Sequence, residues 1–310
     1  RARVVPLVAG KVELPSDISG VVYVDDTNWQ IDIAKEMKAA GVHMSNLGGM
    51  RSRYNHFGYE NAGNTYSVTV HRGVAERAAK PSGYTFRRFS YEESPVAEMK
   101  ALYDAKPVHY VYDESQFALR LANARAYAYT VHAPDGSLFG YISLNGAQGV
   151  RELIVKDDNE IPSVIFDFVL AEQDKVEIPF GQWQLPYMRR LIDVGTGITY
   201  RENGMWQILR WEEVLRAFLA FKASYAELEE GTLVVEIEGE GRFALSVSGG
   251  KVEVGKTNLP AHAAMKPLDA TRFFFSIMPK LYVPGAPREV MRLVESWLPL
   301  PLTWFGTEAV

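Results

Sequence analysis

The sequence predicts an α+β protein. Helical patterns alternate with strands in which apolar and polar residues alternate, and glycine turns join some neighbouring strands. Apolar residues make up 47% of the 310 positions and aromatic residues 12%, which is typical of a folded globular chain and argues against disorder. A chain of this length is expected to contain two or three domains.

The composition excludes several classes of function. The net charge of −5 makes a nucleic-acid partner unexpected, because phosphate binding requires a basic surface. The chain has no cysteine, so disulfides, thiolate metal sites and cysteine nucleophiles are excluded. No apolar run reaches the ~18 residues of a membrane helix, and the first ten residues do not form a secretory signal. We therefore expect a cytoplasmic protein that does not enter the membrane.

The first block covers residues 1–82. Its residues 66, 68 and 70 are apolar and alternate with polar ones, which indicates a half-buried strand. The predicted elements of this block are strands at 4–12 and 21–24, a helix at 30–40 ended by Gly41, a strand at 42–47, and a hairpin-like pair around 59–70.

The second block covers residues 83–222 and the third covers residues 223–310. Ser94-Pro95 and Asp113 are typical helix starts. The other elements predicted in the second block are strands at 84–89, 126–132, 138–144, 151–156 and 176–180 and a helix at 163–171. A hydrophobic helix at 206–224 leads into the third block, which holds strands at 233–237, 242–247 and 251–254 and helices at 270–277 and 287–297.

Several catalytic motifs are absent from the sequence. There is no G-x-S-x-G nucleophile elbow and no G-x-x-x-x-G-K-[ST] phosphate loop. None of the six histidines is paired at helical spacing, so no metal site is predicted. The informative region is residues 21–63, in which a strand, a short loop, a helix and a second strand lead to a Gly-Gly turn and an aromatic segment. A helix that begins at the end of a strand offers free backbone N–H groups to an anion such as a pyrophosphate.

This region resembles the core of the GNAT acyltransferases. The segment Tyr54-Asn-His-Phe-Gly-Tyr-Glu60 is similar to the Y-x-x-F-G-[YF]-E signature of those enzymes. The likeness extends over most of the chain, because the third block, with GRFALSVSGGKVEV and the ending SWLPLPL, looks like a sterol-carrier-like module. This is the layout of the enhanced-intracellular-survival (Eis-like) acetyltransferases. The resemblance implies tandem GNAT-like mixed-sheet domains, the first N-terminally incomplete, followed by a sterol-carrier-like α/β sandwich.

The resemblance implies N-acetyl transfer from acetyl-CoA to a primary amine of a small molecule or of lysine. Tyr54 matches the general acid that protonates the leaving thiolate, a task that suits a phenol because its ordinary pKa is about 10. The α-carboxylate of Val310 matches the base or amine anchor, with Glu308 beside it as a substrate-binding residue. The alternatives without a catalytic role are that Tyr54 is a packed aromatic side chain and that the tail is a frayed chain end.

The resemblance also implies the residues that hold acetyl-CoA. Two of them depart from the family pattern: Trp29 replaces a basic or amide residue, and Asp32 replaces a glycine. A carboxylate about 4 Å from a phosphate costs roughly 4 kcal/mol at an effective dielectric constant of 20. A cofactor-free scaffold and an apolar-ligand carrier therefore stay open as alternatives, and a homo-oligomer is possible. The implied cofactor-binding residues are Val22, Val24, Trp29, Ile31, Asp32, Ile33 and Ala34.

Overall fold

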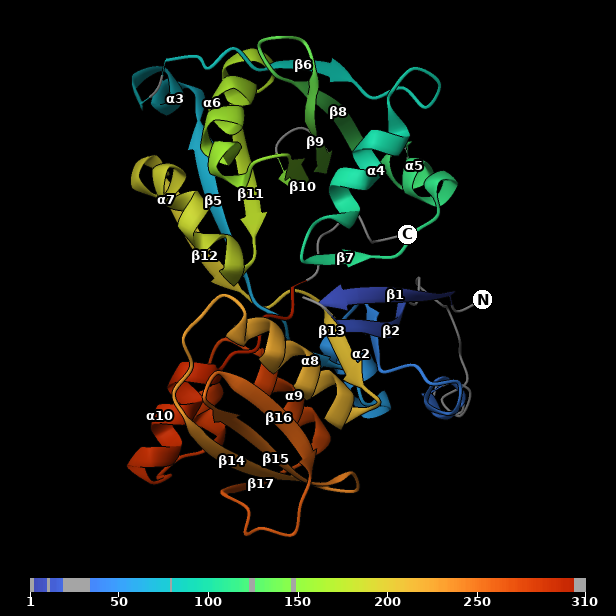
Figure 1. The fold of residues 1–310 in the computed structure, drawn as a ribbon, viewed down its shortest axis with the longest axis vertical. Coiled ribbons are helices and arrows are strands. Elements are labelled where there is room, and N and C mark those ends of the chain that lie inside the picture. The colour runs from blue at the N-terminus through green and yellow to red at the C-terminus, as the bar shows by residue number, and fades with distance from the viewer. Residues whose placement is uncertain are drawn as a thin grey trace. The chain divides into compact units, whose positions relative to one another are not determined.

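A computed structural model describes residues 3–9, 12–18, 34–78, 80–122, 126–145 and 149–303. They form two compact units, each assembled from separate stretches of chain (Figure 1). Unit 1 takes its described residues from Arg1–Asn64, Pro107–Val111 and Arg201–Thr303, and unit 2 takes its own from Thr65–Lys106 and Tyr112–Tyr200. These units follow spatial contact, whereas the three predicted blocks follow chain order, and the block boundaries stay a prediction.

Unit 1 contains a six-stranded and a four-stranded sheet. The six-stranded sheet has the order β4-β13-β3-β2-β1-β7, and only its β2–β3 pair is parallel. The four-stranded sheet has the order β16-β15-β14-β17, with β14 and β17 parallel. Strand bounds are β1 Arg3–Ala9, β2 Val12–Ile18, β3 Met44–Leu47, β4 Glu60–Asn61, β7 Val108–Tyr110, β13 Met205–Ile208, β14 Gly231–Ile237, β15 Gly241–Ser248, β16 Lys251–Lys256 and β17 Ala263–Met265.

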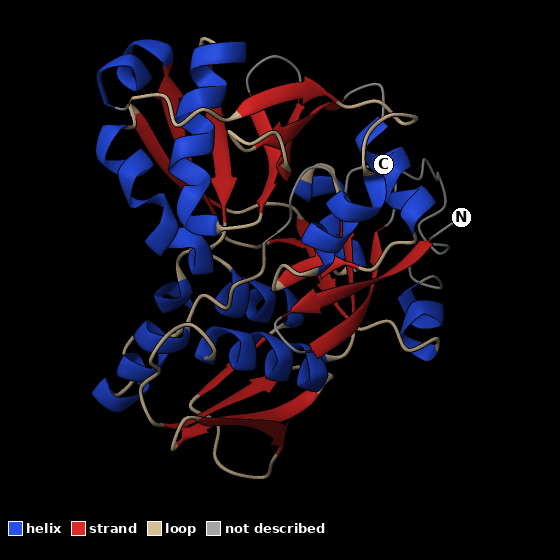
Figure 2. Cartoon of the chain, turned by 45° about the horizontal axis from the view of Figure 1, so that its top comes forward, coloured by secondary structure: helices blue, strands red, loops and turns tan. Residues whose placement is uncertain are grey.

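The long helix α8 (Trp211–Ala223) is the centre of unit 1. It contacts β1 and β2 of one sheet and β15 and β16 of the other, and Figure 2 shows helices stacked on the four-stranded sheet. Eight of its side chains are buried, as expected of a helix that is apolar on most of its circumference. The other helices of unit 1 are a segment at 34–39, α2 (Arg51–Tyr54), α9 (Pro267–Phe275) and α10 (Arg288–Trp297).

Unit 2 is built on one seven-stranded sheet of order β12-β5-β11-β10-β9-β8-β6. Its β10–β11 pair is parallel, and these two strands are joined by helix α6 (Ile161–Glu172). The strand bounds are β5 Thr65–His71, β6 Thr85–Arg88, β8 Ala126–His132, β9 Leu138–Asn145, β10 Gly149–Val155, β11 Lys175–Phe180 and β12 Gly197–Arg201. The remaining helices are α3 (Arg72–Ala78), α4 (Val96–Asp104), α5 (Glu114–Ala122) and α7 (Leu185–Val194).

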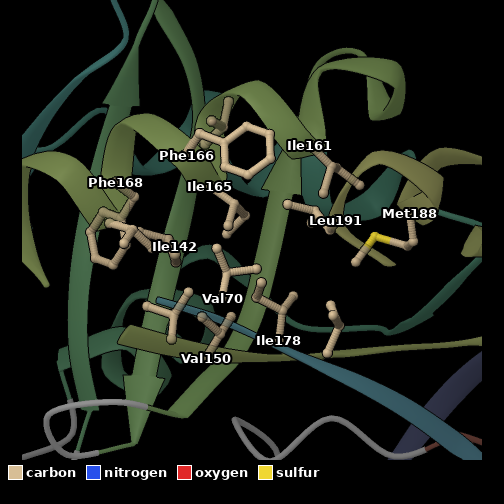
Figure 3. Packing of buried hydrophobic residues seen from close by; sticks show 14 of the residues in the cluster. Val70, Ile142, Val150, Ile161, Ile165, Phe166, Phe168, Ile178, Met188 and Leu191 are labelled. Carbon is tan, nitrogen blue, oxygen red and sulfur yellow. The ribbon is translucent and has the colours of Figure 1, made fainter. Parts of the chain in front are cut away.

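Both faces of the unit 2 sheet are covered by helices. Side chains of α6, among them Phe166 and Phe168, pack over the sheet on a face that includes Ile142 (Figure 3). The adjacent residue Tyr141 points to the opposite face, because successive side chains of a strand alternate. There its ring lies 5.8 Å from that of Phe117 on α5.

Most of the predicted elements are confirmed. The structure contains the strands at 84–89, 126–132, 138–144 and 176–180 and the hairpins of the third block, with bounds shifted by a few residues. Asp113 begins α5, since its carboxylate accepts a hydrogen bond of 2.8 Å from the backbone N–H of Gln116. Gly41 ends the helix at 34–39 with φ +87°, as predicted. The predicted strand at 21–24 lies outside the described residues.

Three predictions are wrong. The single strand predicted at 4–12 is instead the end of β1 and the start of β2, which pair antiparallel with Ala9 opposite Val12. The hairpin around 59–70 does not form, because β4 pairs with β13 and β5 pairs with β11. The start of the helix at 206–224 is instead strand β13 (Met205–Ile208), inserted between β3 and β4. The apolar residues of β13 continue into α8, so no change of period separates the two elements in the sequence.

Candidate functional site

The candidate site lies at the carboxyl end of the parallel pair β2–β3 in unit 1. Residues 16–18 of β2 pair with residues 44–46 of β3, and the helix that includes 34–39 belongs to the connection between them. In sheets with parallel strands, ligands commonly bind beyond the carboxyl ends of those strands. Strand β3 ends at Leu47 and leads through Gly48-Gly49 into α2, whose last residue is Tyr54.

The ring of Tyr54 is held in a small apolar cluster. It packs with Leu47, Tyr59 and Met205, and its side chain is 8% exposed. The ring also lies directly against Gly49, where an added Cβ would stand 2.4 Å from the Tyr54 Cε2 atom. By contrast, a Cβ added at Gly48 would meet no atom within 4 Å. Among the described residues, the Tyr54 hydroxyl forms no hydrogen bond, so its proton is available to a ligand.

The second tyrosine of the signature differs from the first. The Tyr59 hydroxyl shares a hydrogen bond of 2.8 Å with Ser45 Oγ on β3, and both side chains are buried. On the neighbouring strand β13, the Gln207 side chain donates a 3.0 Å hydrogen bond to the carbonyl of Phe57. These contacts anchor the signature to the sheet and make Tyr59 a structural residue of the site.

The signature ends on a buried carboxylate, Glu60, which is 1% exposed. It accepts hydrogen bonds from Arg51 Nε at 2.5 Å and Arg51 Nη2 at 2.6 Å, and from the backbone N–H of Asn61 at 2.8 Å. Arg272 of α9 lies 4.0 Å from the same carboxylate and forms a 3.1 Å ion pair with Glu202. The hydrogen bond and charge of Glu60 raise the pKa of Arg51 above its ordinary value. The cluster braces α2, and with it Tyr54.

The predicted cofactor-binding residues are described only in part. Val22, Val24, Trp29, Ile31, Asp32 and Ile33 lie outside the described residues. Ala34 is the first described residue of the helix at 34–39 and packs against Met37, Val42 and Leu209. Its side chain therefore contributes to packing, and the assignment of these residues to acetyl-CoA stays a prediction.

The predicted tail residues Glu308 and Val310 also lie outside the described residues. The chain leading to them is docked in unit 1: Leu300 and Leu302 are fully buried, and Thr303 is 3% exposed. The Thr303 hydroxyl donates a 2.7 Å hydrogen bond to the carbonyl of Asn64, four residues beyond Glu60. The structure thus brings the start of the tail to the segment that follows the signature.

Sequence reasoning missed several residues that support the site. Ser45, Arg51 and Asn64 belong to or adjoin the region of the signature, but nothing in the sequence pairs them with Tyr59, Glu60 and the tail. Arg272 and Gln207 come from elements more than 140 positions along the chain from the signature. One feature of the sequence could have indicated a cationic partner for Glu60. This carboxylate ends an aromatic segment, and a carboxylate that is buried requires a cationic partner.

The described residues contain neither a metal-binding group nor a membrane-spanning helix. In the part of the chain that the structure describes, no group of three or more His, Asp or Glu side chains is arranged to hold a metal ion. Over the same residues, no helix is long and apolar enough to cross a membrane.

Comparison of the fold identifies its class. No protein-family model matches the chain, and no curated protein matches it by sequence. Among solved structures, the fold is similar to those of GNAT N-acetyltransferases. A GCN5-related N-acetyltransferase from Kribbella flavida superposes with a TM-score of 0.66 at 16% identity, over 96% of this chain and 80% of that one.

Two further structures give the same result. Eis1 from Mycobacterium abscessus matches with a TM-score of 0.67 at 16% identity, over 99% of this chain and 85% of that one. A probable N-acyltransferase from Enterococcus faecalis V583 matches with a TM-score of 0.69 at 15% identity, over 97% of this chain and 84% of that one. At these identities the likeness shows the fold. It supports the predicted GNAT-like α+β architecture and does not test the sterol-carrier-like third block.

Proposed function

We propose that this protein is an acyltransferase that moves an acetyl group from acetyl-CoA to a primary amine, with Tyr54 as its general acid. The observation that carries the proposal is the position of Tyr54, whose phenol is fixed by packing at the carboxyl end of the parallel pair and has no hydrogen-bond partner among the described residues. The GNAT fold of the similar structures supports the same reaction class.

In this reaction a C–N bond forms between the amine and the acetyl carbon, and the C–S bond of the thioester breaks. Tyr54 gives its proton to the sulfur as that bond breaks, and a base accepts the proton that the amine loses. A phenol suits the first task, since its ordinary pKa of about 10 lies close to that of a thiol, about 8.5. Packing against Gly49 and Leu47 keeps the hydroxyl in one place, which lowers the entropy cost of the transfer.

Acetyl-CoA supplies the acetyl group and the sulfur leaving group, and the residues that we propose to hold it are the backbone of 22–24 and the loop 29–34. These residues precede the described helical segment at 34–39, and in the predicted arrangement the free N–H groups of a helix amino end would suit a pyrophosphate.

Unit 2 contains the same order of elements as the candidate site of unit 1, with three acidic residues in the turn before its helix. Its antiparallel pair β9–β10 is followed by α6 and by β11, which is parallel to β10. The turn that precedes α6 carries Asp157, Asp158 and Glu160. Hydrogen bonds from Asn159 lower the pKa of Asp157, so that carboxylate stays ionised at neutral pH. Asp158 is paired with Lys106 at 2.5 Å, but the turn keeps two further carboxylates, which are unfavourable for a pyrophosphate and support a degenerate role for unit 2.

The second candidate function is a cofactor-free scaffold, and the observation that favours it is the pair Trp29 and Asp32 in the predicted pyrophosphate loop. Isothermal titration of the full chain with acetyl-CoA separates the two. Saturable heat supports the enzyme, and Asp32→Gly should then tighten binding because it removes a negative charge. Absence of heat in both the natural chain and Asp32→Gly would favour the scaffold.

We also propose that the tail completes the site. The carboxylate of Val310 would accept or anchor the amine, with Glu308 as a further contact for a cationic acceptor. The docked path of residues up to Thr303 supports this proposal. Appending two glycines after Val310 moves its carboxylate without removing a residue, and we expect kcat to fall. Unchanged kcat would remove the carboxylate from the mechanism.

The third block, residues 223–310, is proposed to correspond to the sterol-carrier-like module of the resembled enzymes. Many of its apolar side chains, including Phe243, Leu245 and Phe273, are at most 2% exposed, whereas Leu259, Met278 and Leu281 are more than half exposed. The packing of the buried side chains in the interior of unit 1 supports a structural role for the block.

The two tyrosines of the signature provide the test of the proposed acid. Tyr54→Phe removes the proton donor and should lower kcat by about 100-fold, within the usual range for general acid catalysis. Tyr59→Phe removes a phenol that is already bonded to Ser45 and should leave kcat within about two-fold, at a cost of about 1 kcal/mol in stability. CoA release with a panel of polyamines, aminoglycosides and lysine peptides is the assay. Equal effects of the two substitutions would contradict the role of Tyr54.

A further inference from the structure

A pocket with a volume of about 310 Å³ lies in unit 1 at the amino end of α8. This volume is at the lower end of the range found for small-ligand sites. Its apolar lining residues are Leu209, Trp211 and Phe243, each at most 4% exposed. Its charged lining residues are Lys38, Arg210, Glu212, Glu213, Glu240 and Lys256. A ligand in this pocket would therefore meet both apolar and charged side chains.

The pocket is separate from the candidate site at Tyr54. Strand β13 connects the two regions, because Met205 at its beginning belongs to the cluster around Tyr54 and Leu209 follows directly after its last residue. At roughly 3.3 Å per residue, Leu209 lies about 13 Å along the chain from Met205. None of the residues that line the pocket is assigned to Tyr54, to acetyl-CoA or to the tail. An occupant of the pocket therefore takes no direct part in the proposed transfer.

The three carboxylates that line the pocket are already paired with cations. The pairs are Lys38–Glu240 at 2.9 Å, Arg210–Glu213 at 3.9 Å, and Arg216–Glu212, which lie one turn apart on α8. Each negative charge of the lining thus has a positive charge beside it. The paired groups leave the pocket close to neutral, and any preference for a charged ligand must come from the groups that remain.

Two hydrogen-bond donors of the pocket remain without a partner. The Lys256 side chain, at the end of β16, forms no ion pair or hydrogen bond with the residues that the structure describes. The Trp211 Nε1 atom is buried and likewise has no hydrogen-bond partner within the described ranges. Arg216 of α8 donates a 2.8 Å hydrogen bond to the carbonyl of Val254, which ties the strand of Lys256 to the helix of Trp211. A buried N–H group without an acceptor is rare in folded proteins, and a ligand oxygen in the pocket would supply one.

The amino end of α8 adds to the preference for a negative ligand. The helix begins at Trp211, and no side chain caps its first turn. The first N–H groups of a helix have no partner within the helix, and its dipole places partial positive charge there. Lys256 supplies one full positive charge, so the pocket matches a ligand with a single negative charge. A dianion would bring a second charge close to the three carboxylates, which is unfavourable.

We propose that this pocket binds a small monoanionic carboxylate with an apolar body. The carboxylate accepts hydrogen bonds from Trp211 Nε1 and from Lys256 Nζ, and the apolar body lies against Leu209 and Phe243. A carboxylate suits this pair of donors because its two oxygens accept from both while it carries one charge. The proposal concerns a second site of the protein and does not depend on acetyl transfer.

The first test is a titration of the full chain with benzoate, followed through the indole N–H resonance of Trp211 in the NMR spectrum. This resonance is assigned by its loss in Trp211→Phe. We expect a saturable shift, because the indole N–H gains an acceptor. Benzamide, which has the same shape without the charge, should bind about ten-fold more weakly. A Trp211 resonance that benzoate does not move, or that inorganic phosphate moves while benzoate does not, would overturn the proposal.

The second test needs no assignment of the resonance and no activity. Calorimetric titration with benzoate should show binding that Lys256→Met weakens about ten-fold, because the substitution removes a charged donor. Lys251→Met is the matched control, since Lys251 is an exposed lysine at the other end of β16 and does not line the pocket. Its affinity for benzoate should equal that of the natural chain. Equal affinities in Lys256→Met and Lys251→Met, or no saturable binding by the natural chain, would overturn the proposal, whatever the outcome for acetyl transfer.

Discussion

The close contact between Gly49 and Tyr54 makes a specific prediction about catalysis. Replacing Gly49 with alanine places a Cβ 2.4 Å from the Tyr54 Cε2 atom and 2.9 Å from its Cδ2 atom, whereas ordinary contacts begin at 3.4 Å. The ring must therefore move by about 1 Å, which is the difference between 3.4 Å and 2.4 Å. Because Tyr54 is packed between Leu47 and Met205, part of this displacement must pass to the hydroxyl.

A displacement of about 1 Å in a catalytic group can cost about 100-fold in rate. We expect Gly49→Ala to lower kcat by about this factor, with a loss of stability of about 1–3 kcal/mol from overpacking. Gly48→Ala is the matched control, since its Cβ meets nothing within 4 Å and neither glycine has a positive φ. It should leave kcat within about two-fold and should not destabilise the fold.

The assay is CoA release from acetyl-CoA with a saturating amine, and chemical denaturation confirms that both variants are folded. The double variant Gly49→Ala/Tyr54→Phe should be no slower than Tyr54→Phe alone, because Tyr54→Phe already removes the hydroxyl that Gly49→Ala displaces. If folded Gly49→Ala keeps the kcat of Gly48→Ala, the position of the Tyr54 ring does not matter to the reaction, and the role of Tyr54 as acid is wrong.

Two predictions concern stability. Burial lowers the pKa of Lys222 from 10.5 to about 8. Between these two pH values the unfolded state therefore binds more protons than the folded state, and the free energy of unfolding rises with pH. The stability of the natural chain relative to Lys222→Met should increase by about 3 kcal/mol from pH 8 to 10.5. A difference that stays flat in denaturation curves across this range would contradict the burial of a charged amine. In unit 2, Arg120 pairs at 3.1 Å with buried Glu152, which also accepts a 2.7 Å hydrogen bond from Tyr141. Arg120→Met should lower the free energy of unfolding by about 3 kcal/mol, because it leaves this carboxylate unpaired. Adding Glu152→Gln to that variant should recover at least half of the lost stability. A double variant as unstable as Arg120→Met would argue against the pairing.

The sequence predicted local structure well where a local rule applies. The carboxylate of Asp113 caps α5, the positive φ of Gly41 ends the helix at 34–39, and the glycine turns of the third block form hairpins. Each of these features depends on a few adjacent residues. Strand partners depend on the whole chain, which is why β5 was recognised as a half-buried strand but was given the wrong neighbour.

In the candidate site, too, the sequence predicts the local feature and not the long-range contacts. The motif located Tyr54, and the structure adds why its ring is fixed, through Gly49 and the cluster around Leu47. The anchors of the site could not be predicted, because Asn64 meets residues more than 230 positions away. No local pattern indicates that such a pair will come together, since the contact depends on how α8 and α9 hold residues 298–303.

The central claim is that Tyr54 protonates the leaving sulfur of acetyl-CoA. The most direct measurement is single-turnover transfer of a labelled acetyl group from acetyl-CoA to an amine, in the natural chain and in folded Tyr54→Phe. We expect transfer in the natural chain and transfer that is about 100-fold slower in Tyr54→Phe, because the substitution removes the proton donor. Transfer by Tyr54→Phe at the natural rate would contradict the claim.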